Sequence, residues 1–313
     1  MPSVSLPTKP ALTTGFGGPF DLADGSAYAR WREHKLSEYP ASVDELIVPV
    51  EDPLRLRTSE HAAMLRQISR ANMAVYHLGG DAPAAKSTIR RLGEHFGLRR
   101  LDDNLCADED SVTTLRVVDQ GRHRGYIPYT NRRLNWHTDG YYNPPGHTVR
   151  AILMHCVMPA EQGGANGLLD HEMAYLLMRD RDPAYIEALM QPDVMTIPPN
   201  TEGGETVRGA QSGPVFSIDP STGALHMRYT ARTRSIEWKN ESVVREATEC
   251  LGELLSRDSG PVLWHRLEAG QGLISNNVLH CRTGFTDSTE PGARRVLYRA
   301  RYYDRIDMTP GEG

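Results

Sequence analysis

The sequence predicts a mainly β fold with flanking helices, in which antiparallel sheets form a sandwich or a jelly-roll barrel. From residue 112 onward, short runs of strand-forming residues alternate with turns rich in Gly, Pro and Asn. Only two helical stretches interrupt these runs, which is too few to connect the strands of a parallel sheet. The expected strands are 112–118, 148–157, 215–218, 224–229, 262–267, 271–275 and 296–303.

The first hundred residues are expected to mix helices with short strands. Residues 1–27 are rich in Pro, Gly, Ser and Thr, which predicts an irregular N-terminal arm. Helices are expected where apolar residues recur at helical spacing, and strands where they alternate with small or polar residues. The expected elements are a helix over 21–34, a strand over 47–50, a helix from Ser59, a strand over 73–78 and a helix over 83–96.

Two helices are expected in the later part of the chain. The first runs from 170 to about 190 and is split at Asp182-Pro183, a capping residue followed by a first-turn proline. The second begins near Asn240 and ends by Gly260. Between them, 196–214 holds four glycines and three prolines and is expected to be a long loop. It is either a lid beside the site or a surface excursion without a role.

No interior segment is long enough to be a domain linker, which predicts a single domain over 1–313. Within it we distinguish the irregular arm over 1–27, a mixed helix and strand flank over 28–110, and a jelly-roll core over 111–305 that carries the site.

Composition limits the partners and the compartment. The net charge of −5 provides no broad basic field for nucleic acid or anionic membrane. There is no run of eighteen apolar residues for a transmembrane helix, and the N-terminus lacks the basic start and apolar core of a signal peptide. The four cysteines form no CxxC pair, which fits a reducing cytoplasm. We therefore expect a cytoplasmic protein with no nucleic-acid or membrane partner.

A candidate metal site begins at His137 and Asp139. Residues two apart on an extended strand project from one face, so both side chains could reach one ion. Among twelve histidines such a pair is weak evidence by itself. It gains weight from His280, 143 residues later, which only a closed sheet would bring to the same place. Two histidines and one carboxylate are the facial triad that holds non-haem Fe(II).

Several arginines follow the third candidate ligand, His280. Strand alternation would place Arg295, Arg299 and Arg301 on one face. Buried guanidinium groups are costly unless carboxylates meet them, so this face suits an anionic co-substrate or paired acidic residues.

The motifs Asn135 to Gly140 (NWHTDG), Gly163 to Gly167 (GGANG), Asn276 to Phe285 (NNVLHCRTGF) and Arg294 to Asp304 (RRVLYRARYYD) together resemble the taurine dioxygenase (TauD/TfdA) family. Members are Fe(II)- and 2-oxoglutarate-dependent oxygenases. The middle section, where Gly163-Gly164 leads into a helix, is closer to the γ-butyrobetaine and trimethyllysine hydroxylase branch.

The resemblance implies a double-stranded β-helix core of the cupin-like jelly-roll type, with cofactors Fe(II), 2-oxoglutarate and O2. It implies iron ligation by His137, Asp139 and His280. Arg295 would receive the distal carboxylate of 2-oxoglutarate, Arg299 would be a second arginine near the site, and Asn166 stands where the family often has threonine. The resemblance also implies a homo-oligomer, either dimer or tetramer.

The expected reaction is oxidative decarboxylation of 2-oxoglutarate to succinate and CO2, coupled to hydroxylation or oxidative cleavage of a small polar or anionic molecule. The candidate substrate residues are Asn135, Tyr141, Tyr142, Arg133 and Tyr229. Aromatic residues near the motif, including Trp136 and Trp238, could form a cage for a quaternary ammonium group or could be barrel core.

Two other classes remain open on the sequence alone. A metal-dependent hydrolase or isomerase on a cupin-like barrel would use the same three ligands for zinc and activate water. A non-catalytic jelly-roll binding module would need no metal. The downstream arginines favour the oxygenase, because neither alternative requires them.

Overall fold

The computed structural model describes residues 17–79, 85–102, 110–118, 126–232, 236–256 and 260–309. Residues 1–16 of the expected arm, and the first two residues of the helix expected over 83–96, lie outside these ranges. No helix in the described ranges is long and apolar enough to cross a membrane.

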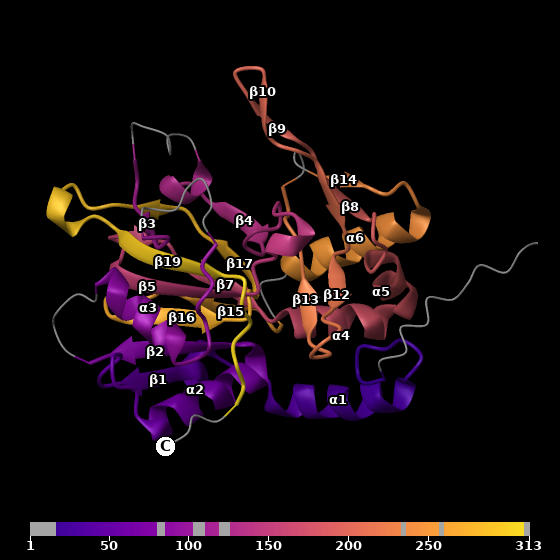
Figure 1. Ribbon diagram of the computed structural model, residues 1–313, viewed down its shortest axis with the longest axis horizontal. Helices are drawn as coiled ribbons and strands as arrows, with labels where there is room; N and C mark the ends of the chain where they lie inside the picture. The colour runs from indigo at the N-terminus through magenta and orange to yellow at the C-terminus, as the bar shows by residue number, and fades with distance from the viewer. Residues whose placement is uncertain are drawn as a thin grey trace, which may run out of the picture.

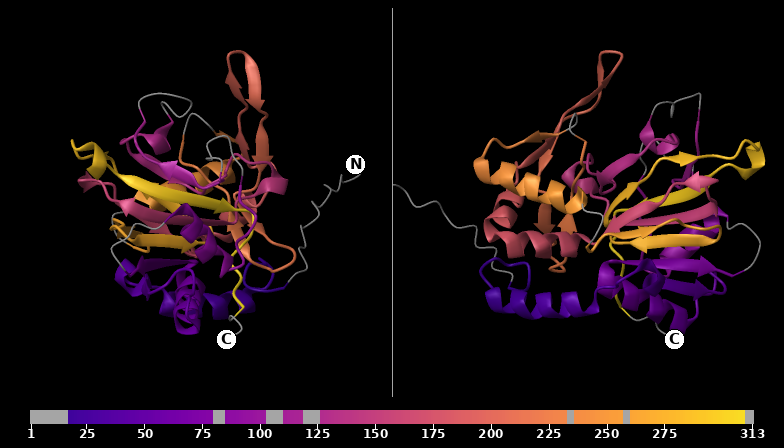
Figure 2. Two further views of the ribbon diagram at one scale, coloured as in Figure 1. Left: turned by 60° about the vertical axis from the view of Figure 1, so that its left-hand side comes forward. Right: turned by 180° about the vertical axis from the view of Figure 1, so that it is seen from behind.

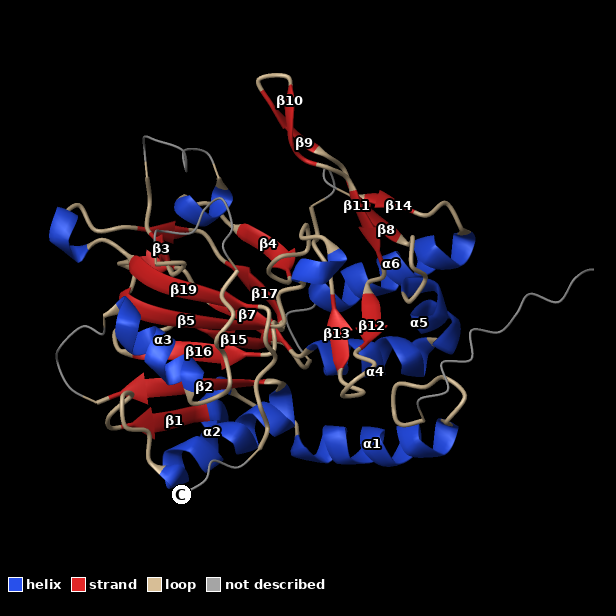
Figure 3. Cartoon of the chain, in the orientation of Figure 1, coloured by secondary structure: helices blue, strands red, loops and turns tan. Residues whose placement is uncertain are grey.

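Two sheets form the core, and they lie face to face in Figures 1 and 3. The larger has the order β1 (Ile47–Val50), β2 (Met73–Leu78), β16 (Gln271–Ser275), β5 (Ala151–Met158), β19 (Val296–Tyr302) and β3 (Thr113–Leu115). The smaller has the order β15 (Leu263–His265), β7 (Asn166–Leu169), β17 (Leu279–Arg282) and β4 (Leu134–His137). Their pairings are antiparallel, except that β1 runs parallel to β2. The predicted mainly β class with a jelly-roll core is confirmed.

The larger sheet is apolar on both faces, as strand β5 shows. Ile152 and Met154 point into the layer between the two sheets, where they join Leu168 of β7. Ala151 and Leu153 point to the opposite face and pack under helices. Because side chains alternate along a strand, burial on both faces gives a continuous apolar run rather than an alternating one.

Two helices cover the outer face of the larger sheet. They are α2 (Thr58–Ala71) and α3 (Lys86–Glu94), and their apolar stripes belong to the cluster that includes β2 and β5. Helix α2 begins where Glu60 accepts the backbone N–H of Arg57 at 2.9 Å, and it ends at Asn72 in the left-handed conformation (φ 55°). Helix α1 (Gly25–Glu38) begins later than expected, because Asp24 rather than Asp21 caps it through the Ala27 N–H.

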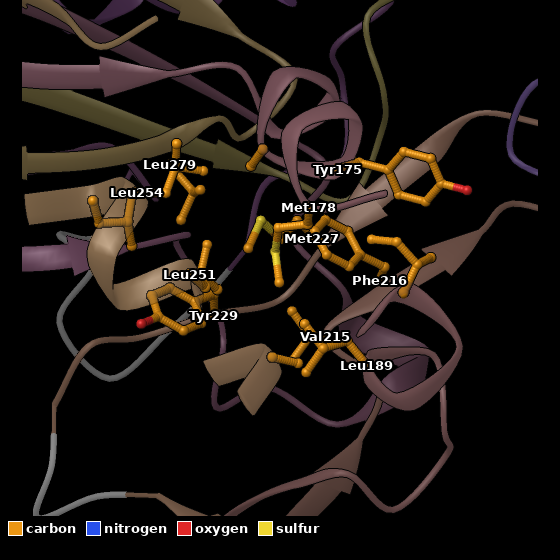
Figure 4. Packing of buried hydrophobic residues seen from close by; sticks show 14 of the residues in the cluster. Tyr175, Met178, Leu189, Val215, Phe216, Met227, Tyr229, Leu251, Leu254 and Leu279 are labelled. Carbon is orange, nitrogen blue, oxygen red and sulfur yellow. The ribbon is translucent and has the colours of Figure 1, made fainter. Parts of the chain in front are cut away.

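A second apolar cluster fills a mainly helical lobe beside the sheets. It joins α4 (His171–Arg181), α5 (Pro183–Leu189) and α6 (Ser242–Ser256) to β12 (Phe216–Ile218) and β13 (Leu225–Met227). Figure 4 shows Met178, Phe216 and Met227 meeting there, with Leu279 of β17 at the boundary to the sheets. The expected split holds: Asp182 accepts the N–H of Ala184 at 2.9 Å and Pro183 starts α5.

The expected long loop over 196–214 is wrong in its secondary structure. It contains most of β8 (Met195–Ile197), then β9 (Asn200–Glu202), β10 (Glu205–Arg208) and β11 (Gln211–Gly213). Gly203 and Gly204, both with positive φ, form the two-residue turn between β9 and β10. The resulting hairpin projects from the body in Figure 2. Two of the four glycines that suggested a loop are thus the turn residues of a hairpin.

Candidate functional site

Strands β4 and β17 bring two of the candidate ligands together. They pair antiparallel with His137 directly opposite His280, and the two imidazole ring centroids are 4.2 Å apart. Cross-strand neighbours are the closest side chains that a sheet offers. The register of one strand pair therefore places two histidines that are far apart in the sequence next to each other in space.

Asp139 reaches the same place from a turn, not from the strand that the sequence predicted. Strand β4 ends at His137, and Asp139 begins the turn that follows. Asn277 fixes this turn: its Oδ1 accepts the N–H of Asp139 at 2.8 Å, and its Nδ2 donates to the Asp139 carbonyl at 2.9 Å. The same Nδ2 donates to the carbonyl of Val149 at 2.7 Å.

The three side chains present their ligand atoms to one point. One atom each from His137, Asp139 and His280 lies within 4.8 Å of the others, and all three residues are buried. The Nδ1 atoms of His137 and His280 lie 2.8 and 2.9 Å from the carbonyls of Asn135 and Val278. Donation there leaves each Nε2 with a lone pair. Oδ2 of Asp139 is buried without a hydrogen-bond partner among the described residues. This donor set fits Fe(II).

Electrostatics keep Asp139 and His280 in the protonation states that a metal needs. Burial would raise the pKa of Asp139, but Arg299, whose Nη1 is 3.2 Å from Oδ1, and the histidine beside it hold that pKa well below its usual range. Burial lowers the pKa of His280 to about 4. At neutral pH the site therefore offers an ionised carboxylate and a neutral imidazole.

The arginines of β19 are not equivalent. Arg299 pairs with Asp139, and Arg301 pairs with Asp102 and donates to the Tyr142 hydroxyl at 2.9 Å. Arg295 precedes the strand, and the register shifts between Val296 and Leu297. The residue left unpaired by this shift is on β5, and Arg295 lines one hollow together with Leu297, as the expected alternation predicts.

Arg295 instead enters a small polar hollow at the other end of the smaller sheet. It stacks over Phe285, whose ring centroid is 5.0 Å from the guanidinium, and Arg282 stacks on the same ring at 4.8 Å. Asn166 and Arg266 also line the hollow. Burial lowers the pKa of Arg282 to about 9 and also lowers that of Arg295. No described salt bridge neutralises these three arginines.

The glycine pair of the GGANG motif shapes this hollow. Gly163 has φ 73°, and a Cβ there would lie 2.4 Å from the carbonyl oxygen of Gly284. Only glycine fits this approach. Gly164 follows directly, and its own Cβ position lies 3.8 Å from Nε of Arg295.

The predicted substrate residues divide into three groups. The Tyr141 ring lies 6.5 Å from His137 and 5.1 Å from Tyr142, so both tyrosines adjoin the triad. Tyr229 is buried, and its backbone is hydrogen-bonded to Thr138. Asn135 and Arg133 have exposed side chains, and Asn135 contributes its carbonyl to His137 instead.

An aromatic cage is not formed by the residues that the sequence suggested. Trp136 is buried and packs edge-to-face on Trp264, with ring centroids 6.3 Å apart. Trp238 packs against the helical lobe. The described ring contacts connect neither tryptophan to Tyr141 or Tyr142, so their role is in the core.

Comparison with known proteins gives a family match over most of the chain. The model described as "Taurine catabolism dioxygenase TauD, TfdA family" matches residues 37–301. A curated relative from Amycolatopsis sp., named uridine-5'-phosphate dioxygenase, is 31% identical over 231 residues, covering 70% of this chain and 78% of the relative. This relative does not support the expected γ-butyrobetaine and trimethyllysine hydroxylase branch.

Solved structures share the fold. Asparagine oxygenase in complex with Fe(II), 2S,3S-3-hydroxyasparagine and succinate gives a TM-score of 0.56 at 18% identity, over 93% of this chain and 86% of that one. The non-heme iron oxygenase OrfP in complex with Fe and α-ketoglutaric acid gives 0.58 at 16% identity, over 90% and 91%. At such identities the likeness establishes the architecture.

Proposed function

This chain belongs to the TauD, TfdA family of dioxygenases, and from that premise we propose that His137, Asp139 and His280 hold its catalytic iron. The chain is a non-haem iron dioxygenase that uses Fe(II), 2-oxoglutarate and O2. The observation that carries the ligand assignment is the cross-strand pair His137–His280 beside a buried Asp139 oxygen with no described partner. The hydrolase and binding-module alternatives are set aside, because neither belongs to this family.

We assign the distal carboxylate of 2-oxoglutarate to Arg295, as the family resemblance implies. Arg295 and its neighbour Arg282 are buried without an acidic partner in a described salt bridge, so an incoming carboxylate would supply the missing charge. The side chain of Asn166 lines the same hollow and can donate a hydrogen bond. Arg299 acts on the other side, where it holds the carboxylate of Asp139 ionised.

When bound, the iron and O2 convert 2-oxoglutarate to succinate and CO2 and oxidise a C–H bond of the substrate. The protein's part is to fix the positions of the three iron-binding side chains and to exclude water from them. Asn277 fixes the backbone of the Asp139 turn, and backbone carbonyls orient both imidazoles. All three ligands are at most 7% exposed, which keeps water away from the reacting groups.

The proposed substrate is a nucleoside 5'-monophosphate, with uridine 5'-phosphate as the first compound to test. The support is the curated relative, which is named for that substrate and is 31% identical. This choice agrees with the small polar or anionic molecule expected from the sequence. The expected reaction on it is hydroxylation or oxidative cleavage, and the single domain and the homo-oligomer stay predictions.

The test measures succinate release by the iron-loaded protein with uridine 5'-phosphate, uridine, taurine and γ-butyrobetaine as alternative substrates. We expect release above the substrate-free background with the nucleotide. Anaerobic addition of Fe(II) and 2-oxoglutarate should give a visible charge-transfer band that His280→Ala abolishes. Retention of the band in that variant would contradict the ligand assignment, and equal background release with all four compounds would contradict the substrate.

A further inference from the structure

The arginines around the triad differ in how their charge is compensated. Arg299 has Asp139 as its partner and Arg301 has Asp102. Arg282 and Arg295 are already assigned to 2-oxoglutarate. Two further guanidinium groups, those of Arg208 and Arg228, lie on the other side of the site, and no described carboxylate pairs with either.

Arg228 is held against the site by backbone carbonyls. Its Nε donates to the carbonyl of Tyr141 at 2.7 Å, and its Nη2 donates to that of Gln211 at 2.8 Å. Its Nη1 donates to the carbonyls of Met195 and Gly213. The next two residues pair with the metal-binding segment, because the Tyr229 carbonyl accepts the Thr138 N–H and Thr230 bridges to His137. Arg228 is therefore a fixed positive charge beside the triad.

Arg208 is on strand β10, at the base of the projecting hairpin. Its guanidinium lies 5.8 Å from the ring centroid of Tyr142, and that ring contacts Tyr141, which in turn contacts His137. Its described hydrogen bonds go to the carbonyls of Gly209 and Pro198, at 3.0 and 2.8 Å. These two bonds leave most of its five N–H donors for a ligand.

Two neighbouring positive charges without a counter-ion cost free energy. Burial lowers the pKa of Arg208, and burial together with the charge of Arg208 lowers the pKa of Arg228 to about 10. The carbonyls around them are dipoles and do not neutralise the charge. A bound anion would neutralise it and would use the free donors of Arg208.

We propose that Arg208, with Arg228 behind it, receives the anionic phosphate of the primary substrate on the Tyr142 side of the metal site. This inference rests on the proposed function and names the residues that would recognise the phosphate group of its substrate. Two guanidinium charges match a phosphate monoester, which is close to a dianion at neutral pH, and the planar fork of arginine suits its oxygens. The co-substrate and the substrate would then each have their own pair of arginines.

The test compares Arg208→Gln and Arg208→Lys with the wild-type protein. Arg181→Gln is the matched control, because Arg181 is exposed at the end of α4 and its substitution changes the charge equally. Anaerobic protein loaded with Fe(II) and 2-oxoglutarate is titrated calorimetrically with uridine 5'-phosphate, uridine and inorganic phosphate. We expect Arg208→Gln to weaken binding of the nucleotide at least tenfold while binding of uridine and 2-oxoglutarate is unchanged. Arg208→Lys should recover part of the loss, and Arg181→Gln should show none.

The outcomes separate this inference from the proposed substrate. Turnover of uridine 5'-phosphate with the same KM and affinity in Arg208→Gln would overturn the phosphate receptor and leave the proposed function intact. If no nucleotide is turned over but binding of inorganic phosphate is lost in Arg208→Gln, the receptor stands and the substrate assignment fails. Equal weakening of uridine and its 5'-phosphate in Arg208→Gln would also overturn the receptor, since the effect would not depend on the phosphate.

Discussion

At the scale of single residues, one amide side chain connects the two parts of the proposed metal site. Asn277 precedes β17, which carries His280, and it bonds both the N–H and the carbonyl of Asp139 in the turn after β4. It also adopts φ 53°, a conformation that asparagine tolerates better than most residues. Hydrogen bonds to the Asn277 side chain therefore fix the position of Asp139 relative to the two histidines.

Asn277→Ala should weaken metal binding about tenfold and destabilise the fold by about 1–3 kcal/mol, because it removes three buried hydrogen bonds. Metal affinity is measured by anaerobic titration with Fe(II), and stability by urea unfolding of the metal-free protein. Asn277→Asp is the comparison: it keeps the acceptor for the Asp139 N–H, loses both donated bonds and adds a buried negative charge facing the two carbonyls. Metal affinity unchanged in the alanine variant would show that the turn holds its shape without this side chain.

His155 gives the protein an acid-sensitive stability that is separate from the site. It is 1% exposed, its ring stacks on Tyr76 with centroids 5.9 Å apart, and burial lowers its pKa to about 4. Between pH 6.5 and 4 the unfolded chain binds a proton at this histidine and the folded chain does not. Stability therefore falls as the pH is lowered through this window.

This histidine should account for up to about 3 kcal/mol of the stability lost between pH 6.5 and 4. His155→Gln should flatten the pH dependence of the free energy of unfolding across that window, whatever its effect at pH 7. His34→Gln, at an exposed position on α1, serves as the control and should leave the slope unchanged. An equal slope in wild type and His155→Gln would assign the acid sensitivity to other groups.

The three side chains that the sequence proposed as ligands do come together, but the residues that hold them in place were not predicted. His137, Asp139 and His280 are recognisable because their types and order carry chemistry. Asn277 and Arg282 were missed, since their roles depend on strand register, and residue type alone does not give register. The placement of Asp139 on β4 was wrong for the same reason: a strand of four residues ends too early to hold it.

At the scale of elements, the hairpin β9–β10 is the part of the chain best placed to respond to substrate. It projects from the body in Figures 1 and 2. Among the described residues, its cation–π contact with the residues around the triad is that of Arg208 with the Tyr142 ring. A two-stranded hairpin has little stability of its own. Contacts with a bound ligand would therefore strongly favour the folded, docked hairpin over its locally opened form.

We expect the hairpin to become resistant to proteolysis when substrate and co-substrate are both present. Limited digestion with trypsin, which can cut after Arg208, should slow at least fivefold when uridine 5'-phosphate is added anaerobically to protein with Fe(II) and 2-oxoglutarate. Cleavage elsewhere in the same sample is the internal reference. An unchanged rate of cleavage after Arg208 would show that the hairpin is a surface excursion rather than a lid.

Helices were easier to predict than strands in this chain. Helices α2, α3 and α6 carry apolar stripes at helical spacing over nine or more residues, which the sequence shows directly. Strands β4, β7 and β17 have only four residues each, too few to show a period. These short strands form most of the smaller sheet, so the sheet that positions the proposed metal ligands is the one with the weakest sequence signal.

At the scale of the whole molecule, a buried polar network joins the N-terminal third to the helical lobe and to the site. Nζ of Lys35 on α1 lies 2.5 Å from Asp170 and 2.8 Å from Glu172 at the start of α4. Asp170 also accepts a hydrogen bond from Asn72, the residue that ends α2. Asn72 in turn accepts one from Asn276, the neighbour of Asn277. Helix α1, which Figure 1 shows below α4, is thus connected to the turn that leads into β17, the strand that carries His280.

Lys35→Met should destabilise the protein by about 3–5 kcal/mol, because Lys35 and Asp170 are 4% and 0% exposed and the carboxylate would lose its main counter-charge. The measurement is urea unfolding at pH 7. Adding Asp170→Asn to Lys35→Met should recover part of the loss, since it removes the uncompensated charge. Lys239→Met is the control, as its pair with Asp193 is 32% and 58% exposed and should contribute under about 1 kcal/mol. Equal small losses for Lys35→Met and Lys239→Met would mean that α1 is attached by its apolar contacts alone, with no energetic connection through Asp170 to the site.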